Sequence, residues 1–167
     1  MIKQNSIYNY PILEKVTNAD GNRYYVDPAG NKLSSVTTIL SRTGDKTGLT
    51  EWANRVGEQE ANRIKSEAAG LGSRMHTHLE NFIMEVPRPS GNNVVRKMAS
   101  EMADQIIHHG LVKVQEVWGI EKMLYFPELY AGTSDLIGVH EGRPAIMDYK
   151  TSKKIKKEEY IQDYFLQ

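Results

Sequence analysis

The apolar positions in the central part of the chain recur with helical spacing. Residues that repeat about every 3.6 positions mark one face of an amphipathic helix. The pattern predicts three helices, over residues 49–69, 73–86 and 93–109. Gly70 and Gly72 interrupt it, and because glycine weakens a helix interior, they predict a break between the first two helices.

After these helices the pattern changes to runs of apolar and β-branched residues, which are typical of strands. Residues 111–126 predict one strand, with a bend at Gly119, and residues 129–140 predict a second. A turn over 141–144, Glu-Gly-Arg-Pro, leads to a third strand over 145–150.

The N-terminal residues predict a smaller, β-rich part. Residues 1–20 have no clear period and predict a loosely ordered arm or an edge strand, whereas residues 22–33 predict a β-hairpin. Residues 34–40 fit either a strand or a short helix with Ser35 as its N-cap, and residues 41–48 predict a loop.

These elements together predict an α/β fold. We expect an arm and β-hairpin over 1–48 and a core over 49–167. The core contains a short mixed sheet from residues 111–150, flanked by helices from 49–110 and 153–167.

Composition restricts the function more than the fold. The chain has 21 basic and 21 acidic residues, so any affinity for nucleic acid must come from local patches rather than from net charge. It has no cysteine, which excludes thiolate metal sites and is compatible with a reducing compartment. No apolar run is long enough to cross a membrane, and residues 1–10 lack a signal-peptide core, so we expect a cytoplasmic protein with no membrane partner.

Three charged residues lie in or beside the last two predicted strands. Alternation along a strand places Asp148 and Lys150 on one face and Tyr149 on the other, and antiparallel pairing brings Asp135 to the same face. Two carboxylates suit Mg²⁺, and the lysine adds positive charge near a bound phosphate. The alternative is a salt-bridged hairpin in which Asp148 pairs with Lys150 and Asp135 faces solvent. Acids inside apolar strands favour the metal site, because an unpaired buried acid is costly.

The order of these residues resembles a known family. G-T-S-D at 132–135 and D-Y-K-T-S at 148–152, with G-x-x-x-H at 72–76 upstream, is similar to the PD-(D/E)xK nuclease superfamily, in particular its RecB-type, Cas4-like and mitochondrial genome maintenance exonuclease-like branch. The resemblance runs from about Ser35 to the C-terminus. It implies a restriction-endonuclease-like core and a Mg²⁺- or Mn²⁺-dependent DNA nuclease, above all an exonuclease acting on single-stranded DNA or a DNA end. A phage-encoded member would work in the host cytoplasm.

The resemblance also implies roles for individual residues. The metal ligands would be Asp135, Asp148, the Tyr149 carbonyl and His76. Lys150 would position water and steady the phosphate, and Glu121, with Glu116 as the alternative, matches a glutamate near the metal. His78 lies about 200° from His76 around an ideal helix and should face elsewhere.

Further positive and polar residues are candidate DNA contacts, namely Arg74, Lys153, Lys154 and Gln167. Gln167 fits the first position of the family's Q-x-x-x-Y motif, whose tyrosine would lie beyond the last residue, so we expect a truncated domain rather than a minimal version without the motif. Two other functions stay open: a nucleic-acid-binding module with an inactive site, and a structural domain built on the salt-bridged hairpin.

Overall fold

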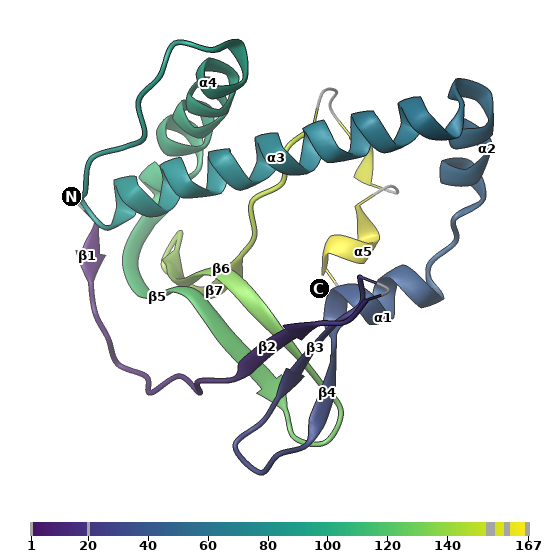
Figure 1. Cartoon of the computed structure of the whole chain (residues 1–167). Coiled ribbons are helices and arrows are strands. Elements are labelled where there is room, and N and C mark those ends of the chain that lie inside the picture. Colours follow the sequence, from purple (N-terminus) through teal and green to yellow (C-terminus); the bar gives the residue numbers. More distant parts are fainter. Residues whose placement is uncertain (1, 20, 153–155, 159–160, 166–167) are drawn as a thin grey trace.

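The computed structural model describes residues 2–19, 21–152, 156–158 and 161–165, and it is an α/β protein (Figure 1). The N-terminal part contains β1 (Lys3–Gln4), β2 (Glu14–Thr17), β3 (Arg23–Val26), β4 (Lys32–Ser35) and α1 (Val36–Thr43). Next come α2 (Thr47–Val56), α3 (Glu58–Ile83), α4 (Val94–His109) and a 3₁₀ turn (Leu111–Lys113). The last elements are β5 (Val114–Phe126), β6 (Tyr130–His140), β7 (Arg143–Met147) and α5 (Gln162–Phe165).

Among the described residues, seven strands form one mixed sheet in the order β1-β5-β6-β4-β3-β2, with β7 also paired to β6. The predicted hairpin and mixed sheet are confirmed, but the sheet extends well beyond residues 111–150. It is larger because Ser34 and Ser35 of β4 pair in parallel with Tyr130 and Ala131 at the start of β6. The N-terminal hairpin is thereby fixed beside the long β5–β6 pair.

Helix α3 is continuous, so the predicted break at Gly70 and Gly72 is wrong. A glycine inside a helix costs only about 1 kcal/mol relative to alanine, and the buried face of α3 outweighs this cost by packing Leu71, Met75, Leu79 and Ile83. The helix boundary falls instead at Gly57, whose φ of 87° lies outside helical geometry.

Two further boundaries differ from the prediction. Ser35 caps α1 through a hydrogen bond from the Thr38 amide (3.0 Å). Helix rather than strand is therefore the correct alternative for the residues after Ser35. Because α1 continues to Thr43, the predicted loop is shorter than expected. Strand β7 ends at Met147, and Asp148–Lys150 follow the strand instead of continuing it. The reason is local: the Tyr149 amide donates to the Asp135 carboxylate (2.7 Å), which draws the chain away from the ladder.

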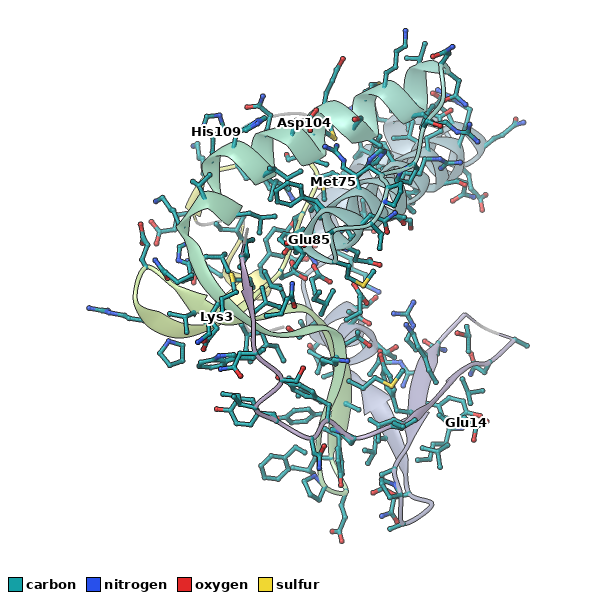
Figure 2. All side chains as sticks on the ribbon, turned by 90° about the vertical axis from the view of Figure 1, so that its left-hand side faces the viewer. Lys3, Glu14, Met75, Glu85, Asp104 and His109 are labelled. Carbon is teal, nitrogen blue, oxygen red and sulfur yellow. The ribbon has the colours of Figure 1, made fainter. Side chains whose placement is uncertain are left out.

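The main core lies between the sheet and the helix pair α3–α4. Met75 and Leu79 of α3 pack there with Ile107 of α4 and with Val117 and Leu136 of the sheet. Figure 2 shows Met75 where α3 meets α4. A smaller cluster of Leu13, Tyr25, Leu33 and Ala131 joins the hairpin to β6. In the described part of the chain, no helix combines the length and apolarity needed to cross a membrane.

A buried polar network joins α3 to α4. His78 is only 3% exposed, and Arg88 donates a hydrogen bond from Nε to its Nδ1 (3.3 Å). Arg88 also binds Asp104 (2.6 Å) and Ser100 of α4. Burial, and then the Arg88 charge, hold the pKa of His78 below its usual range. The prediction that His78 faces away from His76 is confirmed, and its role is structural.

This network predicts how stability depends on pH. Because the folded chain lowers the pKa of His78, the unfolded chain binds the proton more tightly. The contribution of neutral His78 should therefore be complete above about pH 6.5, the usual histidine value, and should be lost as the pH falls toward its lower folded pKa.

A His78→Asn variant tests this dependence, because the new amide oxygen keeps an acceptor for Arg88 but the side chain does not titrate. Urea unfolding at two pH values, one near neutral and one about a unit below the usual histidine pKa, should show a smaller loss of stability for this variant than for the wild type. His108→Asn, at an exposed site on the same helix pair, should behave as the wild type. A wild-type-like pH profile for His78→Asn would contradict the assignment.

Candidate metal centre

A cleft of about 650 Å³ lies between α3, the N-terminal hairpin and the β5–β6 pair. Its α3 wall includes Gly72 and His76, and the sheet contributes Glu121 and Asp135. The segment after β7 closes one side. Gly72 faces this segment, since a β-carbon there would lie in ordinary van der Waals contact with the Thr151 hydroxyl, at 3.8 Å. The cleft thus gathers residues from elements that are distant in sequence.

Three potential ligand side chains meet in this cleft. The nearest ligand atoms of His76 (α3), Glu121 (β5) and Asp135 (β6) all lie within 4.8 Å of one another. At an octahedral Mg²⁺, neighbouring ligands are about 3 Å apart and opposite ligands about 4.2 Å apart, because the usual bond length is about 2.1 Å. The three side chains would have to move closer together to bind such an ion, and the residue types present fit a hard divalent cation.

Hydrogen bonds orient two of these residues. Asp135 is buried, 9% exposed, and its Oδ2 accepts from the Tyr149 amide (2.7 Å). His76 Nε2 lies 2.9 Å from the Tyr149 carbonyl oxygen, a contact that requires a proton on Nε2. In the neutral ring, Nδ1 then carries a lone pair, and it lies 3.6 Å from Asp135 Oδ1. Two acceptors that face each other are satisfied by a proton on the ring, by a water molecule that donates to both, or by a metal ion between them.

The charges in the cleft favour a cation as well. Burial raises the pKa of the Asp135 carboxyl, and the nearby Asp148 raises it further, against the hydrogen bond from Tyr149. Glu121 is exposed at the mouth of the cleft, yet partial desolvation, and then the negative charges of Asp135 and Glu80, raise its pKa as well. Each carboxylate is thus destabilised by the removal of water and by its neighbours. A bound divalent cation would relieve both effects.

Of the two candidate glutamates on β5, Glu121 lines the cleft. Glu116 instead binds Lys3 and the Trp118 indole. Glu121 has a φ of 49°, in the left-handed region that a non-glycine residue in a strand rarely adopts. Such strain persists only where the surrounding structure imposes it, and it frequently marks functional positions.

Asp148 and Lys150 line the cleft but lie outside this ligand cluster. The Lys150 ammonium binds the Asp148 carboxylate at 2.6 Å. The ion pair of the salt-bridged alternative is therefore present, whereas the solvent-facing Asp135 of that alternative is not. The Tyr149 carbonyl, the fourth candidate ligand, lies beside the cluster through its contact with His76.

Of the candidate DNA contacts, only Arg74 is among the described residues, and it lies outside the cleft. Arg74 lies on another face of α3, where it donates to the Gly70 carbonyl (2.9 Å) and lines a separate small pocket. Lys153, Lys154 and Gln167 lie outside the described residues.

Two basic residues of the cleft were not identified from the sequence. Lys15 of β2 and Arg23 of β3 line the wall that the N-terminal strands form. Alternation within the hairpin could have placed them on one face, since Thr17 pairs with Arg23 and Lys15 with Tyr25. Their position over the acids follows only from the parallel pairing of β4 with β6, which no sequence pattern indicates.

Comparison with known proteins adds no assignment. A scan against protein-family models finds no match to this chain, and a search of curated proteins finds none either. The functional case therefore rests on the cluster of His76, Glu121 and Asp135, on the adjacent Asp148–Lys150 pair, and on the order in which the chain supplies them.

Proposed function

We propose that this chain is a metal-dependent nuclease that hydrolyses phosphodiester bonds in DNA. The observation that carries the proposal is the convergence of His76, Glu121 and Asp135, with His76 Nδ1 3.6 Å from the buried Asp135 carboxylate. The arrangement of α3, the β5–β6 pair and β7 is compatible with the restriction-endonuclease-like core that the resemblance implies. DNA as substrate, and attack from an end, are taken from that resemblance.

The residues of the cleft would have distinct roles in metal binding and catalysis. Asp135, Glu121 and His76 would hold the ion, with the Tyr149 carbonyl and Asp148 at its margin. The ion would act as a Lewis acid on the phosphate and would lower the pKa of water. Carboxylate and carbonyl oxygens suit Mg²⁺ and Mn²⁺.

Lys150 places an ammonium beside the cluster, where negative charge develops on the phosphate. Asp148 holds that ammonium in place through a hydrogen bond of 2.6 Å. On the hairpin wall, Lys15 and Arg23 supply positive charge for backbone phosphates. The cleft thus presents acids for a cation on one side and bases for a polyanion on the other, which is the charge distribution that a nuclease needs.

The second candidate function is a nucleic-acid-binding module with an inactive site. One observation favours it: Lys150 and Asp148 neutralise each other, and Asp148 is not among the clustered ligands. Isothermal titration calorimetry with Mg²⁺ and Mn²⁺, together with cleavage of an end-labelled oligonucleotide, separates the two. We expect metal binding and metal-dependent cleavage. DNA binding without cleavage would favour the inactive module, and absence of metal binding would contradict the metal centre.

Removal of the imidazole should weaken the metal centre. His76→Ala deletes one ligand and the hydrogen bond to the Tyr149 carbonyl, so we expect metal affinity to fall by at least the roughly 10- to 100-fold that loss of an outer-shell partner costs. His108→Ala, on the exposed side of α4, is the matched control and should bind metal as the wild type does. Calorimetric titration of the three proteins with Mn²⁺ checks this, and equal affinities would remove His76 from the ligand set.

A further inference from the structure

A second pocket, of about 220 Å³, lies on another side of α3 and contains positive charge. Its walls come from α3, from the segment that joins α3 to α4, and from the first turn of α4. The lining residues are Arg74, Thr77, His78, Pro89, Ser90 and Arg96. No acidic residue is among them.

Neither arginine of this pocket pairs with an acidic residue of the described part of the chain. Within the described residues, Arg74 donates to the Gly70 carbonyl (2.9 Å) and Arg96 to the Ser90 carbonyl (3.4 Å), and neither forms an ion pair. Arg88 nearby is different, because Asp104 takes up its charge. A guanidinium has five N–H donors, so both pocket arginines keep most of theirs for a ligand.

The charge and the geometry of these donors favour a phosphate group as the ligand. Two guanidinium groups at one pocket provide planar pairs of donors that match phosphate oxygens. The Ser90 residue adds a small polar wall, and the Nδ1 of His78 is occupied because it accepts from Arg88. The pocket has room for roughly seven waters at about 30 Å³ each, which is enough for a phosphate group with some of its hydration.

The pocket adjoins the metal cleft through one residue. Thr77 lines both, and Ser73, four residues earlier on α3, lines the cleft as well. At about 100° per residue, Thr77 lies between His76 on the cleft side and Arg74 on the pocket side. A ligand that leaves the cleft across Ser73 and Thr77 reaches the two arginines next.

We propose that the pocket formed by Arg74 and Arg96 binds a backbone phosphate of the same nucleic-acid strand whose neighbouring part lies in the metal cleft. This inference rests on the proposed function and extends it, since it fixes the direction in which the strand leaves the cleft, across α3 toward α4. It also assigns a role to Arg96, which no motif in the sequence indicates. Both arginines hold one phosphate, so their contributions overlap.

The test measures binding of a fluorescent single-stranded oligonucleotide without divalent metal, by anisotropy, over a series of salt concentrations. Arg74→Gln, Arg96→Gln and the double variant are compared with Arg143→Gln, which removes the same charge from β7, away from both pockets. A contact with one phosphate on a single strand contributes about 0.7 to the slope of log K against log salt. We expect each pocket variant to weaken binding and to lower the slope by up to about 0.7. The double variant should lower it no further, and Arg143→Gln should keep the wild-type slope.

An equal loss of slope in all variants, Arg143→Gln included, would overturn the proposed phosphate site, because it would show a general effect of charge. Wild-type binding in the two pocket variants would overturn it as well. If inorganic phosphate binds through the same arginines but the oligonucleotide does not bind, the proposal that a nucleic-acid strand occupies the pocket is overturned. An arginine-dependent slope in a protein that never cleaves DNA would support the pocket while contradicting the proposed nuclease. Thermal unfolding of each variant checks that the fold is intact.

Discussion

Asp135→Asn should abolish metal-dependent hydrolysis and should leave the metal-free protein at least as stable as the wild type. The Asp135 carboxylate is buried among other acids, and burial raises its pKa, so its ionised form is a cost to the fold. An asparagine oxygen can still accept from the Tyr149 amide, and its NH₂ group can donate to His76 Nδ1. The amide lacks the charge that holds a divalent cation. We expect the cleavage rate to fall by a factor of roughly 10² to 10³ or more.

Two measurements on the same variant check this result. Urea unfolding without metal gives the free energy of unfolding, and end-labelled oligonucleotide cleavage with Mg²⁺ or Mn²⁺ gives activity. Asp45→Asn is the matched control, because Asp45 caps the turn before α2, outside the cleft lining, and asparagine can take over that role. A stability loss without an activity loss would make Asp135 a structural residue and would contradict the metal centre.

Sequence patterns predicted whether a segment is a helix or a strand better than they predicted its first and last residues. The hairpin of β3 and β4 and the pair β5–β6 follow from alternation and turn residues, which act locally. The continuity of α3 did not follow, because the packing of Met75 and Leu79 against α4 and the sheet outweighs two glycines. The seven-strand sheet did not follow either, since the parallel contact of β4 with β6 joins residues that are far apart along the chain, such as Ser35 and Ala131.

The candidate site was likewise predicted only in part. His76, Glu121 and Asp135 stand on three elements whose faces could be predicted, and the structure brings them together. Asp148 was expected beside Asp135 on a shared strand face, but β7 ends one residue earlier. Once the Tyr149 amide binds Asp135, Asp148 lies nearer to Lys150 than to the cluster. The β6–β7 register is regular up to the pair of Leu136 and Met147, and the strand ends before the position that alternation would place beside Asp135.

Lys150→Ala should separate catalysis from metal binding. The Lys150 ammonium lies beside the cluster, bound to Asp148 at 2.6 Å, and a cation does not ligate a metal ion. Removing it deletes positive charge from the position where negative charge develops during hydrolysis, an effect on the order of 10² to 10³ in rate for one well-placed donor. All three clustered ligands remain, so Mg²⁺ and Mn²⁺ should still bind.

The affinity of the Lys150→Ala variant for metal should even rise. Asp148 loses its partner, so its carboxylate adds uncompensated negative charge to the edge of the cluster. Mn²⁺ titration calorimetry and oligonucleotide cleavage at saturating metal test the two halves of this prediction. Lys122→Ala, on β5 next to Glu121 but outside the cleft, is the matched control and should change neither quantity. Loss of metal binding together with activity would mean that the Asp148–Lys150 pair holds the segment after β7 in place, whereas full activity would exclude Lys150 from the chemistry.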